Sequence, residues 1–135
     1  MGCDIHGYVA TVEPDRSRGS LIGLDGEPRD YRLFGYLAGV RHDVLPVVPP
    51  RGIPDWWDRV TEGIDFMEPR MGWDLGDHTR TWLTANELER ALGMVEVETG
   101  GTRYYWRGVL SLMRGIEQEE GADGCDVFLV LGFDN

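Results

Sequence analysis

The sequence predicts an α+β fold, in which about three helices pack on a small mixed β-sheet. Segment 125–135 is apolar on both faces, which is typical of a strand buried at the centre of a sheet. Segment 3–12 alternates apolar and polar residues, as a half-buried strand does. Three other segments repeat apolar residues at helical spacing. We therefore expect the first and last strands to lie at the centre of the sheet.

The predicted helices span residues 30–41, 85–92 and 104–120. Asp30 is a suitable N-cap for the first helix. Thr84 and Glu87 have the spacing of a capping box at the start of the second helix, and Gly93 is expected to end it. Shorter strands are predicted at 20–24 and at 94–99, where MVEVET alternates, and residues 79–83 are either a short strand or an extended lead-in to the second helix.

Two stretches between the first and second predicted helices are expected to be loops. Residues 42–58 contain four prolines, which remove hydrogen-bond donors and fix φ, so they predict a long, stiff, Pro-rich loop that ends in a helical turn at 55–57. Residues 63–78 are predicted to be irregular. Connections of this length are uncommon in a compact domain and are often functional.

Length, hydropathy and charge limit the class of protein. The 135 residues are expected to form a single domain, 1–135. No apolar run approaches the roughly 20 residues that span a bilayer, and the N-terminus lacks the pattern of a signal peptide, so we expect a cytoplasmic protein with no membrane partner. A net charge of −11 argues against direct binding to a nucleic-acid backbone. All 13 basic residues are arginine. This composition reflects codon bias, bidentate recognition of phosphate or carboxylate by some of the arginines, or both.

Two candidate functional groups share the outer face of the first predicted strand. Asp4 and His6 are two positions apart, about 7 Å along a strand, which suits two ligands around one bound group. The last strand ends at Asp134. If the two strands are antiparallel neighbours, Asp134 faces the beginning of the first strand and completes one site. The structural alternative is that Asp4 caps a helix and His6 is hydrogen-bonded at a sheet edge.

Further candidates lie on the loops and at the end of a helix. Arg51 stands beside prolines and close in sequence to two tryptophans, an arrangement suited to hold a base or a phosphate. Arg41 ends the first predicted helix, and His78 follows Asp74 and Asp77 in a loop that could line a pocket mouth. The structural alternatives are that Arg51 pairs with a surface acid and that the aspartates form Asx-turns.

Several catalytic motifs are absent from the sequence. It contains no G-x-S-x-G, H-E-x-x-H or P-loop, and no G-x-G-x-x-G after a predicted strand. Serine hydrolases, zincins and Rossmann enzymes are therefore disfavoured.

Five motifs follow one another along the chain: CDIHGYV, YRLFGYLAGVR, PPRGIP, DHTRTWLT and FLVLGFDN. In this order they resemble a group of small proteins, of unassigned function, that bacteriophages and some bacteria encode. Where that group usually has serine after the Asp-His pair, this chain has Thr79, which preserves a hydroxyl. The resemblance implies a phage-type, cytoplasmic, single-domain protein, and it assigns no chemistry to individual residues.

The leading hypothesis is a protein that binds a small anionic, nucleotide-like ligand. Arginines would bind its phosphates, a tryptophan would stack on its base, and carboxylates would bind ribose or base donors. The phage association further suggests that such a protein sequesters a host immune signal. The expected pocket is lined by Asp4, His6, Arg41, Arg51, His78, Trp82 and Asp134.

Two hypotheses of other classes compete with this one. The chain can be a metal-dependent hydrolase that acts on a nucleotide or another phosphoester, with the ligands or acid–base groups Asp4, His6, Asp77, His78 and Asp134. It can also be an acidic protein that blocks a host factor through its surface and has no pocket. The sequence is compatible with a bound divalent metal and with a homo-oligomer.

Overall fold

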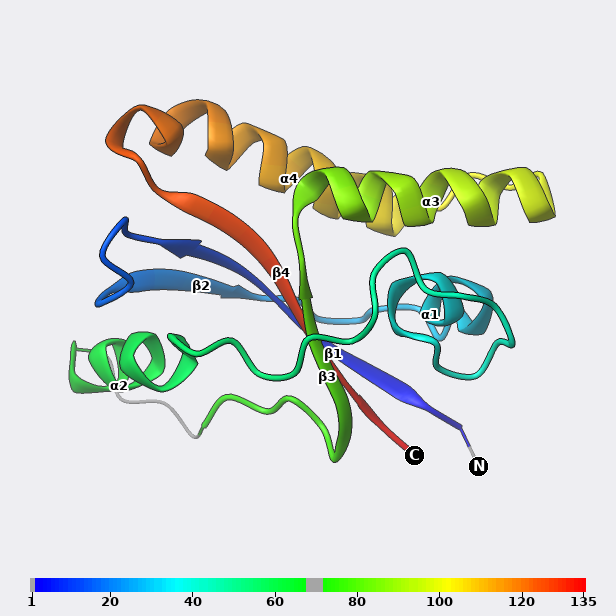
Figure 1. Ribbon diagram of the computed structural model, residues 1–135, viewed down its shortest axis with the longest axis horizontal. Coiled ribbons are helices and arrows are strands. Elements are labelled where there is room, and N and C mark those ends of the chain that lie inside the picture. The colour runs from blue at the N-terminus through cyan, green and yellow to red at the C-terminus, as the bar shows by residue number, and fades with distance from the viewer. Residues whose placement is uncertain (1, 68–71) are drawn as a thin grey trace.

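Four strands form one sheet in the order β2–β1–β4–β3 (Figure 1). In this computed structural model, which describes residues 2–67 and 72–135, the strands are β1 (Asp4–Val12), β2 (Gly19–Gly23), β3 (His78–Leu83) and β4 (Asp126–Asp134). The predicted α+β fold with the first and last strands central is confirmed. The three strand pairings are all antiparallel, so the sheet is antiparallel where the sequence predicted a mixed one.

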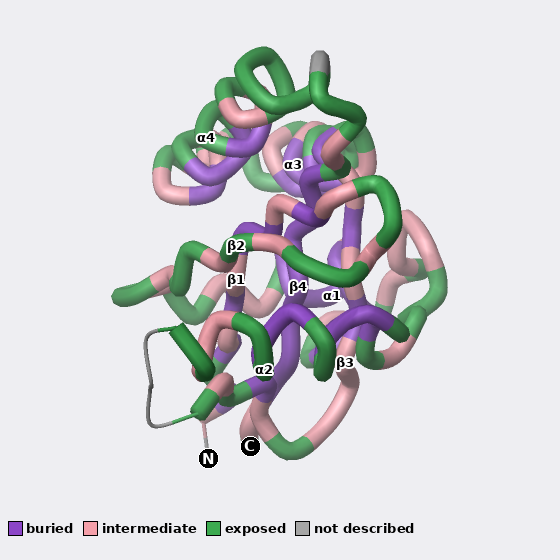
Figure 2. Tube along the Cα trace, turned by 90° about the vertical axis from the view of Figure 1, so that its left-hand side faces the viewer, coloured by how far each residue is buried: buried purple, intermediate pink, exposed green. Residues whose placement is uncertain are grey.

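The helices are divided unequally between the two faces of the sheet. They are α1 (Tyr31–Ala38), α2 (Trp57–Met67), α3 (Ala85–Thr99) and α4 (Tyr104–Glu120), followed by a short 3-10 helix at Gly121–Asp123. Buried residues of α1, α3 and α4 form one core with the sheet, and those of α2 form a second core against the opposite face. Figure 2 shows the buried residues concentrated on β1, β4 and the inner sides of α3 and α4.

β4 contributes to both cores, which explains why its sequence is apolar on both faces. Leu129, Leu131 and Phe133 pack into the core under α1, α3 and α4. The alternate residues Phe128 and Val130 pack into the core under α2. A strand covered on both faces in this way needs apolar residues at successive positions.

Two of the predicted helix caps are present. The side chain of Asp30 accepts a hydrogen bond from the Leu33 amide at 3.2 Å at the start of α1. Thr84 and Glu87 form the reciprocal capping box at the start of α3. Both caps satisfy amide groups that have no partner within the helix.

The strand predicted at 94–99 is wrong, because α3 continues to Thr99. Gly93 lies inside the helix, and Gly100, in the left-handed region at φ 73°, ends it. The alternation of MVEVET is misleading. Val95 continues the buried face of the helix, whereas Val97 is 87% exposed. Packing of the whole helix on the sheet outweighs the local pattern of six residues.

The prediction for 55–57 and 63–78 is also corrected. The helical turn is the start of α2, which extends through Met67, so residues 63–67 are helical. Trp57, Val60 and Thr61 are the buried residues of this helix. Trp57 and Val60 belong to the core on the sheet face opposite α1, α3 and α4. Residues 68–71 lie outside the described part of the chain. The long Pro-rich loop is confirmed between α1 and α2.

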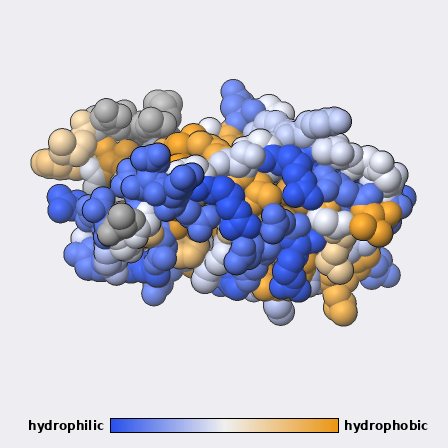
Figure 3. All heavy atoms as spheres, turned by 90° about the horizontal axis from the view of Figure 1, so that it is seen from above, coloured by the Kyte–Doolittle hydropathy of each residue, from blue (hydrophilic) through white to orange (hydrophobic). Residues whose placement is uncertain are grey.

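The face of the molecule over α3 and α4 is largely hydrophilic (Figure 3). From the side of α3 and α4, hydrophilic residues cover most of the molecule and apolar groups appear between them (Figure 3). Within residues 2–67 and 72–135, no helix has the length and apolar composition that crossing a membrane requires.

A close backbone crossing fixes the loop before β3 over the end of β4. A Cβ at Gly132 would lie 1.7 Å from the carbonyl oxygen of Leu75, and one at Gly76 would lie 2.3 Å from the carbonyl oxygen of Phe133. Gly76 and Phe133 form an isolated parallel bridge, and the amide of Asp77 donates to the Phe133 carbonyl at 2.9 Å. Glycine at position 132 therefore permits the loop to lie directly on the strand.

We predict that Gly132→Ala lowers the free energy of unfolding by about 2 kcal/mol or more, because the new methyl group must displace backbone atoms. Urea denaturation followed by circular dichroism measures the change. Gly93→Ala is the matched control, since nothing lies within 4 Å of its Cβ position. Alanine is the better helix former, so this substitution should raise the free energy of unfolding by about 0.5–1 kcal/mol. Equal stabilities for the two variants would contradict the close crossing.

Candidate functional site

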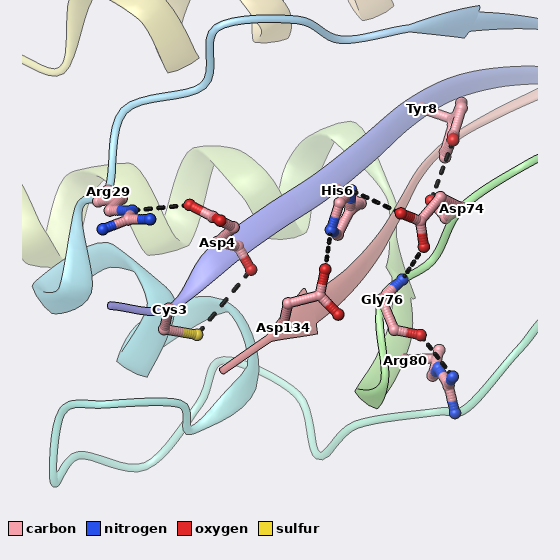
Figure 4. A network of polar contacts seen from close by, with 9 residues as sticks. All are labelled: Cys3, Asp4, His6, Tyr8, Arg29, Asp74, Gly76, Arg80 and Asp134. Atoms are coloured by element: carbon pink, nitrogen blue, oxygen red, sulfur yellow. Dashed lines mark hydrogen bonds and ion pairs between the residues drawn. The ribbon is translucent and has the colours of Figure 1, made fainter. Parts of the chain in front are cut away.

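His6 lies between two carboxylates at the end of the sheet that carries both chain termini (Figure 4). Its Nε2 is 2.5 Å from Oδ2 of Asp134, and its Nδ1 is 3.6 Å from Oδ2 of Asp74. The register pairs Asp4 with Asp134 and His6 with Gly132. Because side chains alternate along a strand, Asp4, His6 and Asp134 point to the face that carries α2. The predicted meeting of Asp134 with the start of the first strand is confirmed.

Asp74 is held in place by its own loop. Its Oδ1 accepts a hydrogen bond from the Gly76 amide at 2.7 Å, which is an Asx-turn, and its carbonyl accepts one from the Tyr8 hydroxyl at 3.0 Å. The ring of Tyr8 packs edge-on against Trp57 and Trp73. Burial raises the pKa of the Tyr8 hydroxyl, which keeps it a neutral donor to the Asp74 carbonyl. The side chain of Asp74 is thus exposed, while its backbone is held in place.

More carboxylates surround this histidine than nearby basic groups balance. Asp4 pairs with the Nε of Arg29 at 2.6 Å, and this hydrogen bond lowers the pKa of Asp4. Glu27 is half-buried; burial raises its pKa, and backbone N–H groups and the charge of His6 oppose the rise. The local surplus of negative charge produces a potential that attracts cations.

The geometry of His6, Asp74 and Asp134 suits a metal ion. One ligand atom from each residue lies within 4.8 Å of the other two. An imidazole nitrogen with two carboxylate oxygens is a donor set used for divalent ions such as Mn²⁺ and Zn²⁺. The side chains of Asp74 and Asp134 are 68% and 37% exposed. An ion held there would keep coordination positions open to water or to a substrate.

Arg41 lies beside this cluster but toward the other face of the sheet. Its Nη2 donates to Oδ1 of Asn135 at 3.2 Å, and its guanidinium lies 5.5 Å from the centre of the Tyr31 ring. Tyr31 belongs to α1, on the face opposite α2. Arg41 also lowers the pKa of the Cys3 thiol, although burial has the larger effect and raises it.

His78 is not part of the cluster around His6. It pairs in register with Phe133 and stacks on the Phe133 ring, with the ring centres 6.2 Å apart. Phe133 belongs to the core under α1, α3 and α4, so β4 separates His78 from His6 and Asp134. The Nδ1 of His78 contacts the hydroxyl of Thr79 at 2.9 Å.

Arg51 and Trp82 form a separate contact near the start of α3. The Arg51 guanidinium lies 4.0 Å above the Trp82 ring and makes two hydrogen bonds of 2.7 Å to the carboxylate of Glu87. A third bond reaches the Trp82 carbonyl at 2.9 Å. Arg51 therefore joins the Pro-rich loop to the capping box of α3, which is the structural alternative that the sequence left open.

Of the seven residues expected to share one pocket, the structure brings His6 and Asp134 into contact, with Asp4 opposite Asp134. Asp74, Glu27 and Arg29 join them and were not among the seven. Asp74 carried a usable signal, since an aspartate two residues before a glycine favours an Asx-turn. Glu27 and Arg29 lie on the connection between β2 and α1, and no local pattern indicates where that connection runs.

Comparison of the chain with protein-family models, with curated proteins and with solved structures finds no match in any of the three.

We predict that Arg51→Gln lowers the free energy of unfolding by about 1–2 kcal/mol at pH 7, because a bidentate charged contact is lost. Hydrogen bonding to Arg51 holds the pKa of Glu87 below its ordinary value of 4.5. The contribution of the contact is thus present above pH 4.5 and is lost as the pH falls through the lowered pKa of the folded state.

Urea denaturation of both proteins between pH 7 and pH 3 measures this pH dependence. The difference between wild type and Arg51→Gln should shrink toward the acid end. Arg18→Gln is the control, because the Arg18 side chain is 79% exposed and its contact with Glu13 is 3.4 Å long. It should change stability by less than about 0.5 kcal/mol. A difference that stays constant over the pH range would contradict the role of Glu87.

Proposed function

We propose that this protein is a metal-dependent hydrolase that acts on a nucleotide or another phosphoester. The supporting observation is the cluster of His6, Asp74 and Asp134, whose ligand atoms lie within 4.8 Å of one another. These residues come from β1, the loop before β3 and the end of β4, so only the folded chain assembles them. Two of them, His6 and Asp134, belong to the set that the sequence suggested for this hydrolase.

Each residue has a defined part in the proposal. When bound, a divalent ion would polarise a phosphoryl oxygen and lower the pKa of a coordinated water. His6 and the two aspartates would hold it. The Tyr8 hydroxyl and the Gly76 amide would orient Asp74 from behind, as partners of metal ligands commonly do. Arg29, fixed by Asp4, would provide positive charge on the same side of the sheet.

The cluster favours the hydrolase over the binding protein that led the sequence hypotheses. The Arg51 guanidinium is already hydrogen-bonded to Glu87. His78 stacks on Phe133 and is separated from His6 by β4. The pocket expected from all seven residues therefore has less geometric support than the three-residue metal site. Sequestration of an intact nucleotide is the alternative that the experiments below distinguish.

We predict that Mn²⁺ raises the melting temperature of the wild-type protein and that EDTA reverses the shift. His6→Ala and Asp134→Asn should each weaken Mn²⁺ binding at least about tenfold in isothermal titration calorimetry, because each removes one ligand. Glu119 is an exposed carboxylate on α4, so Glu119→Gln is the control for a general loss of negative charge. This variant should bind Mn²⁺ as wild type does.

Activity is measured with bis(p-nitrophenyl) phosphate and with nucleotides, each in Mn²⁺ and in EDTA. Metal-dependent release of product by wild type, and its loss in both site variants, is the expected result. A nucleotide that binds without metal and is recovered intact would replace this proposal by sequestration. Equal Mn²⁺ affinity in wild type and His6→Ala would refute the metal site.

A further inference from the structure

β2 and β3 are the two edges of the sheet (Figure 1). The Pro-rich loop is hydrogen-bonded to β3, since the Gly52 amide donates to the Arg80 carbonyl at 2.9 Å. The register of β3 is also irregular, which disturbs the hydrogen-bond ladder near that edge. β2 pairs with β1 on one side, and among the described residues no strand or loop is hydrogen-bonded to its other side. β2 is therefore the open edge of the sheet.

The hydrogen bonds to β1 show which residues of β2 direct their backbone groups outward. The Leu24 amide donates to the Gly7 carbonyl at 2.9 Å, in the same register as the β1–β2 pair. Hydrogen-bonded pairs alternate along an antiparallel ladder, so the even-numbered residues of β2 also bond to β1. The amides and carbonyls of Gly19, Leu21 and Gly23 therefore point to the open edge, where they can bond to a further strand.

This edge lacks the features with which edge strands commonly resist pairing. Gly19–Gly23 contains no charged residue and no proline, and its register with β1 is continuous. A groove of about 340 Å³ lies beside it, with Leu21 of the strand and the α2 residues Val60, Ile64 and Met67 in its lining. A strand added at this edge would thus satisfy the outward backbone groups and cover apolar side chains.

The charges at the two ends of β2 are complementary to those of a second, antiparallel copy. Arg18 directly precedes β2, its side chain is 79% exposed, and its contact with Glu13 is 3.4 Å long. Asp25 lies two residues beyond the other end of the strand and is also exposed. An antiparallel copy brings the positive end of one strand to the negative end of the other, whereas a parallel copy brings like charges together.

We propose that two copies of this protein associate through β2 as a two-fold antiparallel dimer, in which one sheet continues across both chains. In the register centred on Leu21, this residue lies opposite Leu21 of the second copy, and Gly19 lies opposite its Gly23. All outward backbone groups of β2 then have partners. Arg18 comes within one residue of Asp25 of the second copy. The dimer requires no metal and does not depend on the proposed hydrolase.

Sedimentation velocity between about 10 μM and 1 mM protein, in EDTA and about 0.15 M salt, measures the association. Wild type should pass from monomer to dimer over this range, because a single short strand makes a small interface. Amide exchange with water, followed by NMR at both concentrations, locates the contact. The amides of Gly19, Leu21 and Gly23 should exchange at least about twofold more slowly in the concentrated sample. Those of Ser20 and Ile22 should keep their rates, since they already bond to β1.

Charge-swapped variants test whether the partner is a second copy. Arg18→Asp and Asp25→Arg should each raise the dissociation constant of the dimer at least about fivefold, because each places like charges at both ends of the paired strands. An equimolar mixture of the two variants should associate within about twofold of wild type, because opposite charges then meet at both ends. Arg90→Asp, at an exposed position of α3, makes the same change in net charge as Arg18→Asp and should associate as wild type does.

Three results would overturn the proposal. The first is a wild type that stays monomeric at the highest concentration, which would leave the β2 edge to a strand of another protein. The second is a dimer in which the outward amides of β2 keep their exchange rates. The third is a mixture of Arg18→Asp and Asp25→Arg that associates no more tightly than either variant alone. Because EDTA is present throughout, none of these results depends on the metal site.

Discussion

The pairing of β1 with β4 is the constraint on which the rest of the structure depends. Nine residue pairs, from Asp4–Asp134 to Val12–Asp126, join the beginning of the chain to its end. This pairing builds the centre of the sheet and separates the two cores. It also sets the register that brings His6 to Asp134 across 128 positions of sequence. A slip of one residue would move His6 to the opposite face and destroy the cluster.

The third member of the cluster depends on a second contact, between the loop before β3 and the end of β4. Leu75 lies directly on Gly132, which has no side chain to exclude it. That contact holds Asp74 above His6, and the Tyr8 hydroxyl and the Asx-turn fix its backbone. The candidate metal site is thus supported by backbone packing and not by its acidic side chains, which repel one another.

Charge is distributed so that most arginines are already paired. Arg51 with Glu87, Arg107 with Glu96 and Arg114 with Glu89 join separate elements. Around His6, by contrast, carboxylates outnumber their basic partners, which favours a cation.

The sequence by itself determined which strands are central and which residues cap α1 and α3. It also determined that Asp134 lies opposite the start of the first strand. These features depend on alternation and on short capping patterns, which neighbouring residues specify. Only the tertiary structure decided that α3 continues to Thr99 and that α2 is a full helix. It also decided that Asp74 rather than His78 lies beside His6, and that Arg51 forms an ion pair with Glu87. Each of these rests on contacts between distant segments: the burial of a helix face, the Leu75–Gly132 crossing, and a bidentate ion pair. Local propensities are weaker than such contacts, so tertiary packing sets the outcome where the two disagree.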